Sequence, residues 1–438
     1  MASLKELLKS LAQDGATLTR EQAAGVLEEI LSGSVPEVET AALLTVLATR
    51  GEQAPELAGF VDVMRRRVTP LPFTDAERAE LVDAVGTGGG GPLTFNISCG
   101  AALTREQAAG VLEEILAGSV PEVETAALLT VMATRGEQAP ELAGFVDVMR
   151  RRVTPLPFTS AVRDELVDAV GTGGGGPLTF NISCGAALVA SAAGAKVAKH
   201  GNRAVTSLCG AADVLEALGV PIELGPELAV ECLRQTGFVF LFAPLYHPAM
   251  KSLGSLRRAL GFRTIFNLCG PLTNPAGARS QVIGVLAPSK VLLVGRTLAA
   301  LGAKRAFVVH GTDGIDELTT TGESIVARIE ESETGGESTL HAARITPEMA
   351  GLPRATLDQF TGGDVATNSA LLYDVLTGVP GARRDIVLLN AAATLVVAGL
   401  AADLKEGVRQ GAEAIDSGKA AALLAKLRDF GAKHAGTK

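Results

Sequence analysis

A glycine-rich stretch followed by hydroxyl and amide side chains is the part of this chain whose residue types point most directly to chemistry. Five glycines, at positions 171 and 173–176, follow a short apolar segment, and Thr179, Asn181 and Ser183 come after them. Because glycine has no Cβ, successive backbone N–H groups can converge on one point. Such a row of amides before a helix N-terminus attracts an anion. A glycine-rich hairpin or hinge is the alternative interpretation.

Two further segments carry charged groups. Residues 199–207 place two cations, an amide and two hydroxyls within nine positions, a set that could clamp a phosphate. Residues 313–317 contain three carboxylates, Asp313, Asp316 and Glu317. Neighbouring carboxylates repel one another unless a cation lies between them, and such oxygen ligands suit Mg²⁺ bridging to substrate phosphates. Solvated charges in the first segment and an acidic helix N-terminus in the second are the alternatives.

The elements that must position these groups follow an alternating pattern. Apolar segments that predict strands alternate with stretches rich in alanine and leucine, at residues 166–170, 196–198, 238–243, 282–286 and 305–309. This alternation predicts parallel strands in an α/β sheet. In open sheets of this kind ligands collect at the carboxyl ends of the strands. The glycine loop, Lys199 and His310 all fall at such ends, so we expect one shared site.

Length and composition limit the remaining possibilities. A chain of 438 residues with 47% apolar and 20% charged residues is typical of a globular protein of two or three domains. The net charge of −9 disfavours a nucleic-acid or anionic membrane surface. Five cysteines without CxxC spacing indicate a reduced, cytoplasmic protein. The apolar run at 386–402 is shorter than the ~20 residues that a bilayer requires, so we expect a buried helix there.

The N-terminal part contains a tandem repeat. Residues 18–102 recur as residues 103–187 with only five differences among 85 aligned positions. The differences are Ser32/Ala117, Leu47/Met132, Asp75/Ser160, Glu77/Val162 and Ala79/Asp164. Solenoid repeats have shorter periods, so this pattern indicates a recent duplication or an assembly artefact. Each copy predicts three short helices, the first of which follows a capping box at Thr19 or Thr104. One further helix is expected before the first copy, at 4–11.

The second copy is expected to supply the site, because it runs without interruption into Lys199. One sheet has room for one such strand and glycine loop, so the first loop, at 86–99, is expected to lack its partners. Deletion of residues 18–102 is therefore expected to leave activity intact. The alternative is that the helices of the first copy compete for the position of the second or swap between chains.

Several motifs in order resemble one enzyme family. They are Gly171-Thr-Gly-Gly174, Asn181-Ile-Ser183, Lys199-His-Gly-Asn-Arg203, Ala212-Asp-Val-Leu-Glu216, His247-Pro-Ala-Met-Lys251, Gly270-Pro-Leu-Thr-Asn-Pro275 and Asp316-Glu317. Together they resemble anthranilate phosphoribosyltransferases, over about residues 103–438. The resemblance implies a small N-terminal helical-bundle domain and a larger α/β domain with a central, mostly parallel sheet. It also implies homodimers formed through the helical domains.

The implied domain organisation has four parts. The first copy comprises a helical segment at 1–70 and a linker with an unpartnered glycine loop at 71–102. The second copy contributes a helical domain at 103–158. The α/β domain follows at 159–438, with a helical excursion near 245–262 that packs on the helical domain.

The resemblance also implies a reaction and its residues. These enzymes join anthranilate to 5-phosphoribosyl 1-diphosphate (PRPP), releasing diphosphate, in tryptophan biosynthesis. Mg²⁺ would be bound by Ser183, Asp316 and Glu317, and Lys199, Asn202 and Arg203 would stabilise the transition state without acting as acid or base. Anthranilate would contact Gly171, Asn202 and Arg257. The implied substrate-binding residues are Gly171, Gly174, Gly175, Thr179, Asn181, Ile182, Ser183, Cys184, Lys199, His200, Gly201, Asn202, Arg203, Ala204, Val205, Thr206, Ser207, Ala211 and Arg257.

This chain departs from the family pattern at several of these positions. The family usually has Asp at the position of Gly175 and Thr at that of Cys184. A Lys-Ser-Gly-Ser stretch is usual where residues 208–211 read Leu-Cys-Gly-Ala. We therefore expect weaker metal and substrate binding with an unchanged reaction, and Gly175→Asp should tighten it. Two other functions remain open: a pyrimidine nucleoside phosphorylase, and a non-catalytic homologue that binds nucleic acid or a partner.

Overall fold

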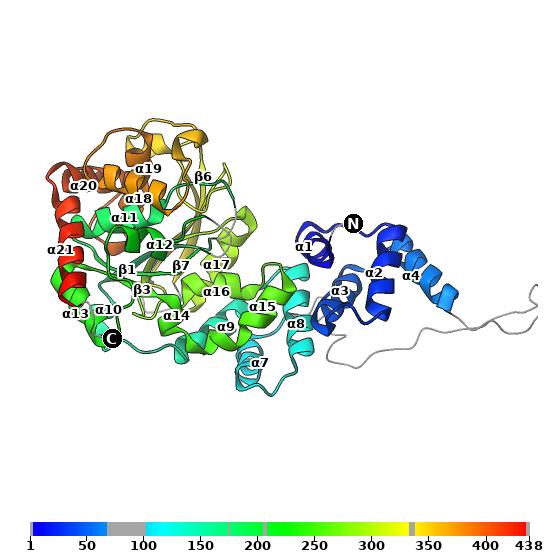
Figure 1. Cartoon of the computed structure of the whole chain (residues 1–438). Coiled ribbons are helices and arrows are strands. Elements are labelled where there is room, and N and C mark those ends of the chain that lie inside the picture. The colour runs from blue at the N-terminus through cyan, green and yellow to red at the C-terminus, as the bar shows by residue number, and fades with distance from the viewer. Residues whose placement is uncertain (1–2, 68–101, 174–175, 205–207, 333–337, 435–438) are drawn as a thin grey trace, which may run out of the picture. The chain divides into compact units, whose positions relative to one another are not determined.

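The structure, a computed structural model, describes residues 3–67, 102–173, 176–204, 208–332 and 338–434 (Figure 1). It divides into two compact units, which are described separately: unit 1 comprises residues 1–141 and 252–266, and unit 2 comprises residues 142–251 and 267–438. The boundary at 141/142 falls inside helix α9 (Ala139–Arg151), earlier than the boundary at 158/159 that the sequence predicts. The glycine loop of the first copy lies outside the described residues.

Unit 1 is helical. Its elements are α1 (Leu4–Asp14), α2 (Arg20–Leu31), α3 (Glu37–Arg50), α4 (Ala54–Arg67), α7 (Arg105–Ala117), α8 (Glu122–Arg135), the start of α9, and α15 (Gly254–Leu260). Both predicted capping boxes are present: the side chains of Thr19 and Thr104 accept hydrogen bonds from the backbone of Gln22 and Gln107, which cap their partners in return. These local hydrogen bonds explain why α2 and α7 begin at equivalent positions.

The two copies share a buried carboxylate that joins their helices. In the first copy Glu56 accepts hydrogen bonds from the Leu18 and Gln53 N–H groups, each at 2.8 Å, and from Arg50 at 2.6 Å. Glu141 of the second copy is fully buried in the same way and also pairs with an arginine, Arg135, at 2.6 Å. Because the sequences are nearly identical, each copy forms the same local structure.

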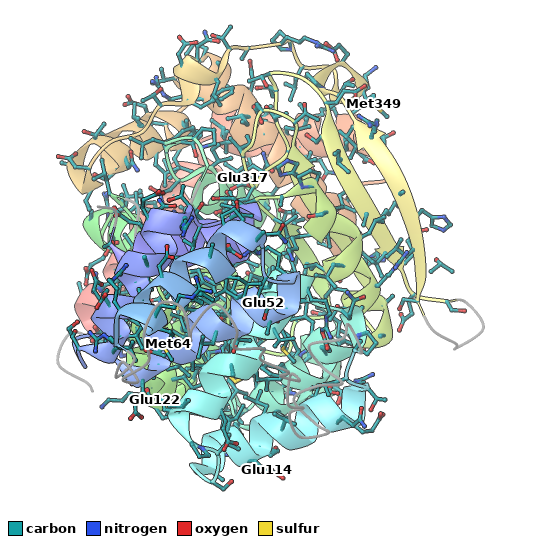
Figure 2. All side chains as sticks on the ribbon, turned by 90° about the vertical axis from the view of Figure 1, so that its right-hand side faces the viewer. Glu52, Met64, Glu114, Glu122, Glu317 and Met349 are labelled. Atoms are coloured by element: carbon teal, nitrogen blue, oxygen red, sulfur yellow. The ribbon has the colours of Figure 1, made fainter. Side chains whose placement is uncertain are left out.

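The copies differ in what covers them. Four large apolar side chains of the first copy are about half exposed, whereas their counterparts in the second copy are buried. The exposed fractions are 52% for Leu44 and 0% for Leu129, 50% for Leu57 and 0% for Leu142, 44% for Val61 and 0% for Val146, and 55% for Met64 and 3% for Met149. Met64 is labelled on α4 in Figure 2. The same apolar face is thus covered in one copy and open to solvent in the other.

Unit 2 is built on a seven-stranded sheet in the order β3-β2-β1-β4-β5-β6-β7. The strands are β1 (Leu166–Gly171), β2 (Lys196–Gly201), β3 (Phe238–Phe242), β4 (Ser280–Gly284), β5 (Arg305–Gly311), β6 (Ser324–Glu330) and β7 (Thr339–Ile345). The first five pair in parallel, whereas β6 is antiparallel to both β5 and β7. The predicted α/β class with a mostly parallel sheet is confirmed, and the sequence did not predict β6 and β7.

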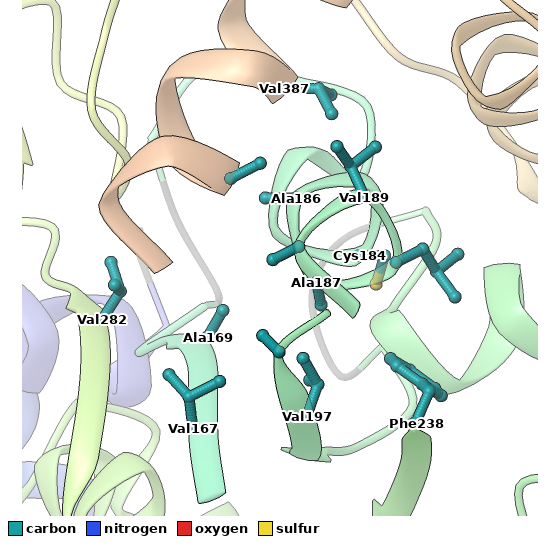
Figure 3. Close-up of a cluster of buried hydrophobic side chains, with 14 of the residues drawn as sticks. Val167, Ala169, Cys184, Ala186, Ala187, Val189, Val197, Phe238, Val282 and Val387 are labelled. Atoms are coloured by element: carbon teal, nitrogen blue, oxygen red, sulfur yellow. The ribbon is translucent and has the colours of Figure 1, made fainter. Parts of the chain in front are cut away.

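Helices pack on this sheet and bury its core. They are the rest of α9, α10 (Ser160–Arg163), α11 (Ile182–Ala192), α12 (Ala211–Ala217), α13 (Pro226–Thr236), α14 (Ala243–Tyr246), α16 (Ile265–Leu272, which begins in unit 1), α17 (Pro288–Ala300), α18 (Val365–Leu376), α19 (Ala382–Ala398), α20 (Leu404–Asp416) and α21 (Lys419–Lys433), with short 3₁₀ turns at Pro248–Leu253, Pro347–Ala350 and Leu357–Phe360. Helices α11 and α19 pack against each other and against β1. Figure 3 shows side chains of these helices gathered over the strands.

Residues 386–398 of the apolar run form most of α19, and 11 of the helix's 17 residues, all within this run, are buried. The prediction of a buried helix there is confirmed. Among the described residues, no helix is long and apolar enough to span a membrane.

Candidate functional site

The carboxyl ends of β1 and β4 meet the acidic segment that follows β5. The Gly173 N–H donates to Oδ2 of Asp316 at 3.1 Å. A Cβ on Gly284 would lie 1.6 Å from the Asp316 carbonyl oxygen, and one on Gly171 would lie 2.4 Å from its Oδ2. Gly284 therefore has no room for a side chain while the Asp316 backbone lies across the strand end, and a side chain at Gly171 would displace the Asp316 carboxylate. The structure brings the glycine loop and the acidic pair together in unit 2.

The neighbouring carboxylate, Glu317, lies at the N-terminus of α11. Both the backbone and the hydroxyl of Ser183 lie close enough to Glu317 to lower the pKa of its carboxyl group. Desolvation by the surrounding protein, followed by repulsion from Asp316, raises the pKa of Glu317 to about 8, against the opposing effects of Lys199 and Ser183. Two carboxylates are thus held close together at a helix N-terminus, where negative charge is favoured.

The buried side chain of Lys199 places a positive charge close to Glu317. Its side chain comes from β2 and is only 1% exposed. The Nζ atom donates to the Ala169 carbonyl of β1, and to Oγ of Ser183 at 3.4 Å. Because its ammonium is buried, Lys199 acts on the site through its charge and through its hydrogen bond to Ser183.

The predicted phosphate loop after β2 is closed by an aspartate of α12. The Ala204 and Gly210 N–H groups both donate to Oδ2 of Asp213 at 2.9 Å. Arg203 pairs with Asp213 at 3.0 Å and with Glu216 at 2.8 Å. In this structure the charge of Arg203 is therefore compensated within the protein. Asp213 belongs to one of the family motifs, but the sequence assigned it no role.

Residues 360–368, to which the sequence assigned no role, contact the segment that follows the glycine loop. Residues 178–180 pair with residues 360–362 through the bridge between Thr179 and Thr361 and the Phe180 N–H, which donates to the Phe360 carbonyl at 3.0 Å. Asn368 of α18 donates to Oδ1 of Asn181 at 3.0 Å. Asn181 thus has a protein partner nearly two hundred residues away in sequence. The only local signal was the Gly362-Gly363 pair directly before Asp364, the N-cap of α18.

Two buried histidines lie next to the site. The ring Nδ1 of His200 lies 3.2 Å from the Gly270 carbonyl oxygen, and its ring centroid lies 5.0 Å from that of His247. Burial lowers the pKa of His200 to about 3 and that of His247 to about 4, so both rings are neutral.

Asn274, in the motif at 270–275, joins β1 to β2. Its side chain donates to the buried carboxylate of Asp168 at 2.7 Å and to the Ala198 carbonyl oxygen at 2.8 Å.

Other predicted residues are placed as follows. Ile182 and Cys184 are buried in the first turn of α11, and Sγ of Cys184 lies 4.0 Å from the Ala211 carbonyl oxygen. Burial raises the pKa of Cys184 to about 11, so its thiol is neutral. Gly174, Gly175 and residues 205–207 lie outside the described residues. Arg257 lies on α15 in unit 1, so its predicted contact with anthranilate stays a prediction.

The residues present fit a magnesium ion. Ser183, Asp316 and Glu317 offer hydroxyl and carboxylate oxygens, the donors that Mg²⁺ prefers. A cation between Asp316 and Glu317 would relieve the repulsion between these two carboxylates. In the part of the chain that the structure describes, no cluster of three or more His, Cys, Asp or Glu residues could hold a metal. Two carboxylates and a hydroxyl suit an ion that keeps several waters and binds substrate oxygens.

Comparisons with known proteins agree with this architecture. Two family models match: the glycosyl transferase family a/b domain over residues 163–421, and the glycosyl transferase family helical bundle domain over residues 5–68 and 98–153. The anthranilate phosphoribosyltransferase of Rhodopseudomonas palustris strain BisA53 is 46% identical over 331 residues, covering 76% of this chain and 95% of the relative.

The chain belongs to the anthranilate phosphoribosyltransferase family. Two solved members of the family have similar structures. The enzyme from Thermus thermophilus is 42% identical with a TM-score of 0.70, covering 77% of this chain and 99% of that chain. The enzyme from Saccharomyces cerevisiae, in complex with PRPP and Mg, is 26% identical with a TM-score of 0.66, covering 76% of this chain and 94% of that chain. The helical-bundle model matches both copies of the repeat.

Proposed function

We propose that this chain transfers the phosphoribosyl group of PRPP to anthranilate, giving N-(5-phosphoribosyl)anthranilate and diphosphate in tryptophan biosynthesis. The observation that carries the proposal is the convergence of Gly171, Gly173, Ser183 and the Asp316-Glu317 pair at the carboxyl ends of β1, β4 and β5. Family membership supports the same conclusion, because solved relatives include an enzyme in complex with PRPP and Mg.

In the proposed reaction the protein mainly has to bind and orient. As diphosphate leaves, negative charge grows on its oxygens and C1 becomes oxocarbenium-like. When bound, Mg²⁺ would supply positive charge to those oxygens. Ser183 lies next to Glu317 and favours its charged form, and Lys199 donates a hydrogen bond to the Ser183 hydroxyl. The amine of anthranilate is already a nucleophile, so its alignment matters more than a strong base.

The departures from the family pattern lie around the proposed diphosphate position. Cys184 is a neutral buried thiol, and Leu208 is 62% exposed where the family usually has a lysine. One cation and several hydroxyls are thus missing from this region. We propose that the absence of these groups weakens the binding of PRPP and metal without changing the reaction. We also propose a cytoplasmic location, because the chain belongs to this family of biosynthetic enzymes.

The direct test follows the loss of anthranilate fluorescence. We expect it only when both PRPP and Mg²⁺ are added, and Glu317→Gln should slow it by at least about tenfold. Gly110→Ala is a suitable control, because a Cβ at this position on α7 would meet nothing within 4 Å. Phosphorolysis of thymidine or uridine without anthranilate turnover would favour a pyrimidine nucleoside phosphorylase instead. A salt-dependent DNA complex without either activity would favour a non-catalytic homologue.

A further inference from the structure

Two nearly identical helices of the repeat pack against each other in unit 1. Helix α3 of the first copy and α8 of the second differ only at Leu47 and Met132, and they form an extended contact. Helices α1 and α15 pack against both. One helix of this chain is therefore covered by its own duplicate.

The two helices bury overlapping faces. Helix α3 buries Ala42, Leu43, Val46 and Leu47. Val131 and Met132, the counterparts of Val46 and Leu47, are also buried, at 3% and 0% exposure. The leucine-to-methionine difference lies within this face and conserves volume, which packed interiors tolerate well. The buried positions of the two helices thus coincide at Val46-Leu47 and Val131-Met132, whereas Ala127 and Leu128, the counterparts of Ala42 and Leu43, are only partly buried.

Equivalent residues of the two copies also meet at one place. A cavity of about 660 Å³ lies at the C-terminal ends of both helices, next to the end of α1. It is lined by Thr49 and Arg50 of the first copy and by their counterparts Thr134 and Arg135. In a self-complementary interface the same patch contributes from both partners. The contact between α3 and α8 has this form, although it lies within one chain.

We infer that α3 occupies, inside this chain, the place that α8 of a second molecule would take in a chain with one copy of the repeat. Without α3, α8 would lose the helix with which it makes its largest contact in unit 1. A second molecule would present the same helix there, with Met132 in place of Leu47. The full chain is therefore a monomer, and a single-copy chain is a homodimer through α8. The inference replaces, for this duplicated chain, the homodimer that the family resemblance implies.

Deletion of residues 18–102 tests the inference. The deletion joins Thr17 to Leu103 and restores the local sequence Thr-Leu-Thr that precedes α2 in the full chain. Size-exclusion chromatography with light scattering should give the mass of one chain for the full protein and of two chains for the deletion variant. A dimeric full chain, including one formed by swapping copies between molecules, would overturn the inference. So would a monomeric deletion variant that retains its helical circular dichroism.

Point variants locate the interface and cover the case in which the deletion variant fails to fold. In the full chain, Val46→Asp should release α3 and raise the dimer fraction, whereas Val61→Asp, at a site 44% exposed, should leave a monomer. A folded Val46→Asp chain that stays monomeric contradicts the inference. In the deletion variant, Val131→Asp should give a monomer, and a persistent dimer would place the interface elsewhere. These masses do not depend on activity, so they separate this inference from the proposed function.

Discussion

Leu142→Ala and Leu57→Ala are matched variants at equivalent positions of the two copies. Comparing them tests which copy of the repeat buries this leucine in the folded protein. Residues 54–67 and 139–152 are identical, so the change in helix propensity is the same in both variants. Leu142 is fully buried, whereas Leu57 is 50% exposed. Truncating a fully buried leucine costs its transfer free energy and leaves a cavity, together about 2–5 kcal/mol. At a half-exposed site no closed cavity forms, and about 1 kcal/mol or less is expected.

Urea unfolding followed by far-UV circular dichroism measures the difference, since the chain has no tryptophan to report by fluorescence. The two units can unfold in separate transitions, so the midpoint of each transition is compared. We expect Leu142→Ala to lower one midpoint clearly and Leu57→Ala to lower none by a comparable amount. Equal shifts of the midpoint, or a larger shift for Leu57→Ala, would refute the conclusion that Leu142 of the second copy is buried and Leu57 of the first copy is not.

The remaining predictions concern the site. Glu317 keeps its proton in the folded protein up to a pKa of about 8, whereas the ordinary value is 4.5. Between these values the folded state binds more protons than the unfolded state, so the free energy of unfolding of the metal-free protein should fall as pH rises. Glu317→Gln should flatten this slope in urea midpoints measured across the window, and an unchanged slope would show that another group causes it. Gly284→Ala places a Cβ 1.6 Å from the Asp316 carbonyl oxygen, so the acidic segment must move and Mg²⁺ binding by titration should weaken about tenfold or more. Magnesium binding equal to that of the Gly110→Ala control would argue against that geometry.

Much of the site was accessible from the sequence because it rests on local patterns. Apolar segments followed by glycine or charged residues mark the ends of β1, β2 and β5, and parallel strands bring such ends to one edge. The roles of Asp213 and Asn368 were not accessible. Asp213 closes its loop through the Ala204 and Gly210 N–H groups, and Asn368 reaches Asn181 from α18. Such contacts join positions with no periodic relation, so no spacing rule reveals them.

The ionisation of the site likewise depended on packing. The pair Asp316-Glu317 could be recognised as a candidate ligand set, but two adjacent carboxylates in a sequence carry no fixed pKa. The raised pKa of Glu317 arises from desolvation and from the Asp316 charge, opposed by Lys199 and Ser183. Lys199 and Ser183 come from other elements and meet Glu317 only when β2 and α11 are in place.

The repeat separates the two kinds of information most clearly. The sequence by itself determined the capping boxes and the helix positions, because these depend on residues close along the chain and recur in both copies. Only the tertiary structure decided that Leu142 is buried and Leu57 is half exposed, and that α3 covers α8. Identical sequences cannot differ in intrinsic preference, so their different burial follows from the neighbours that the rest of the chain brings to them.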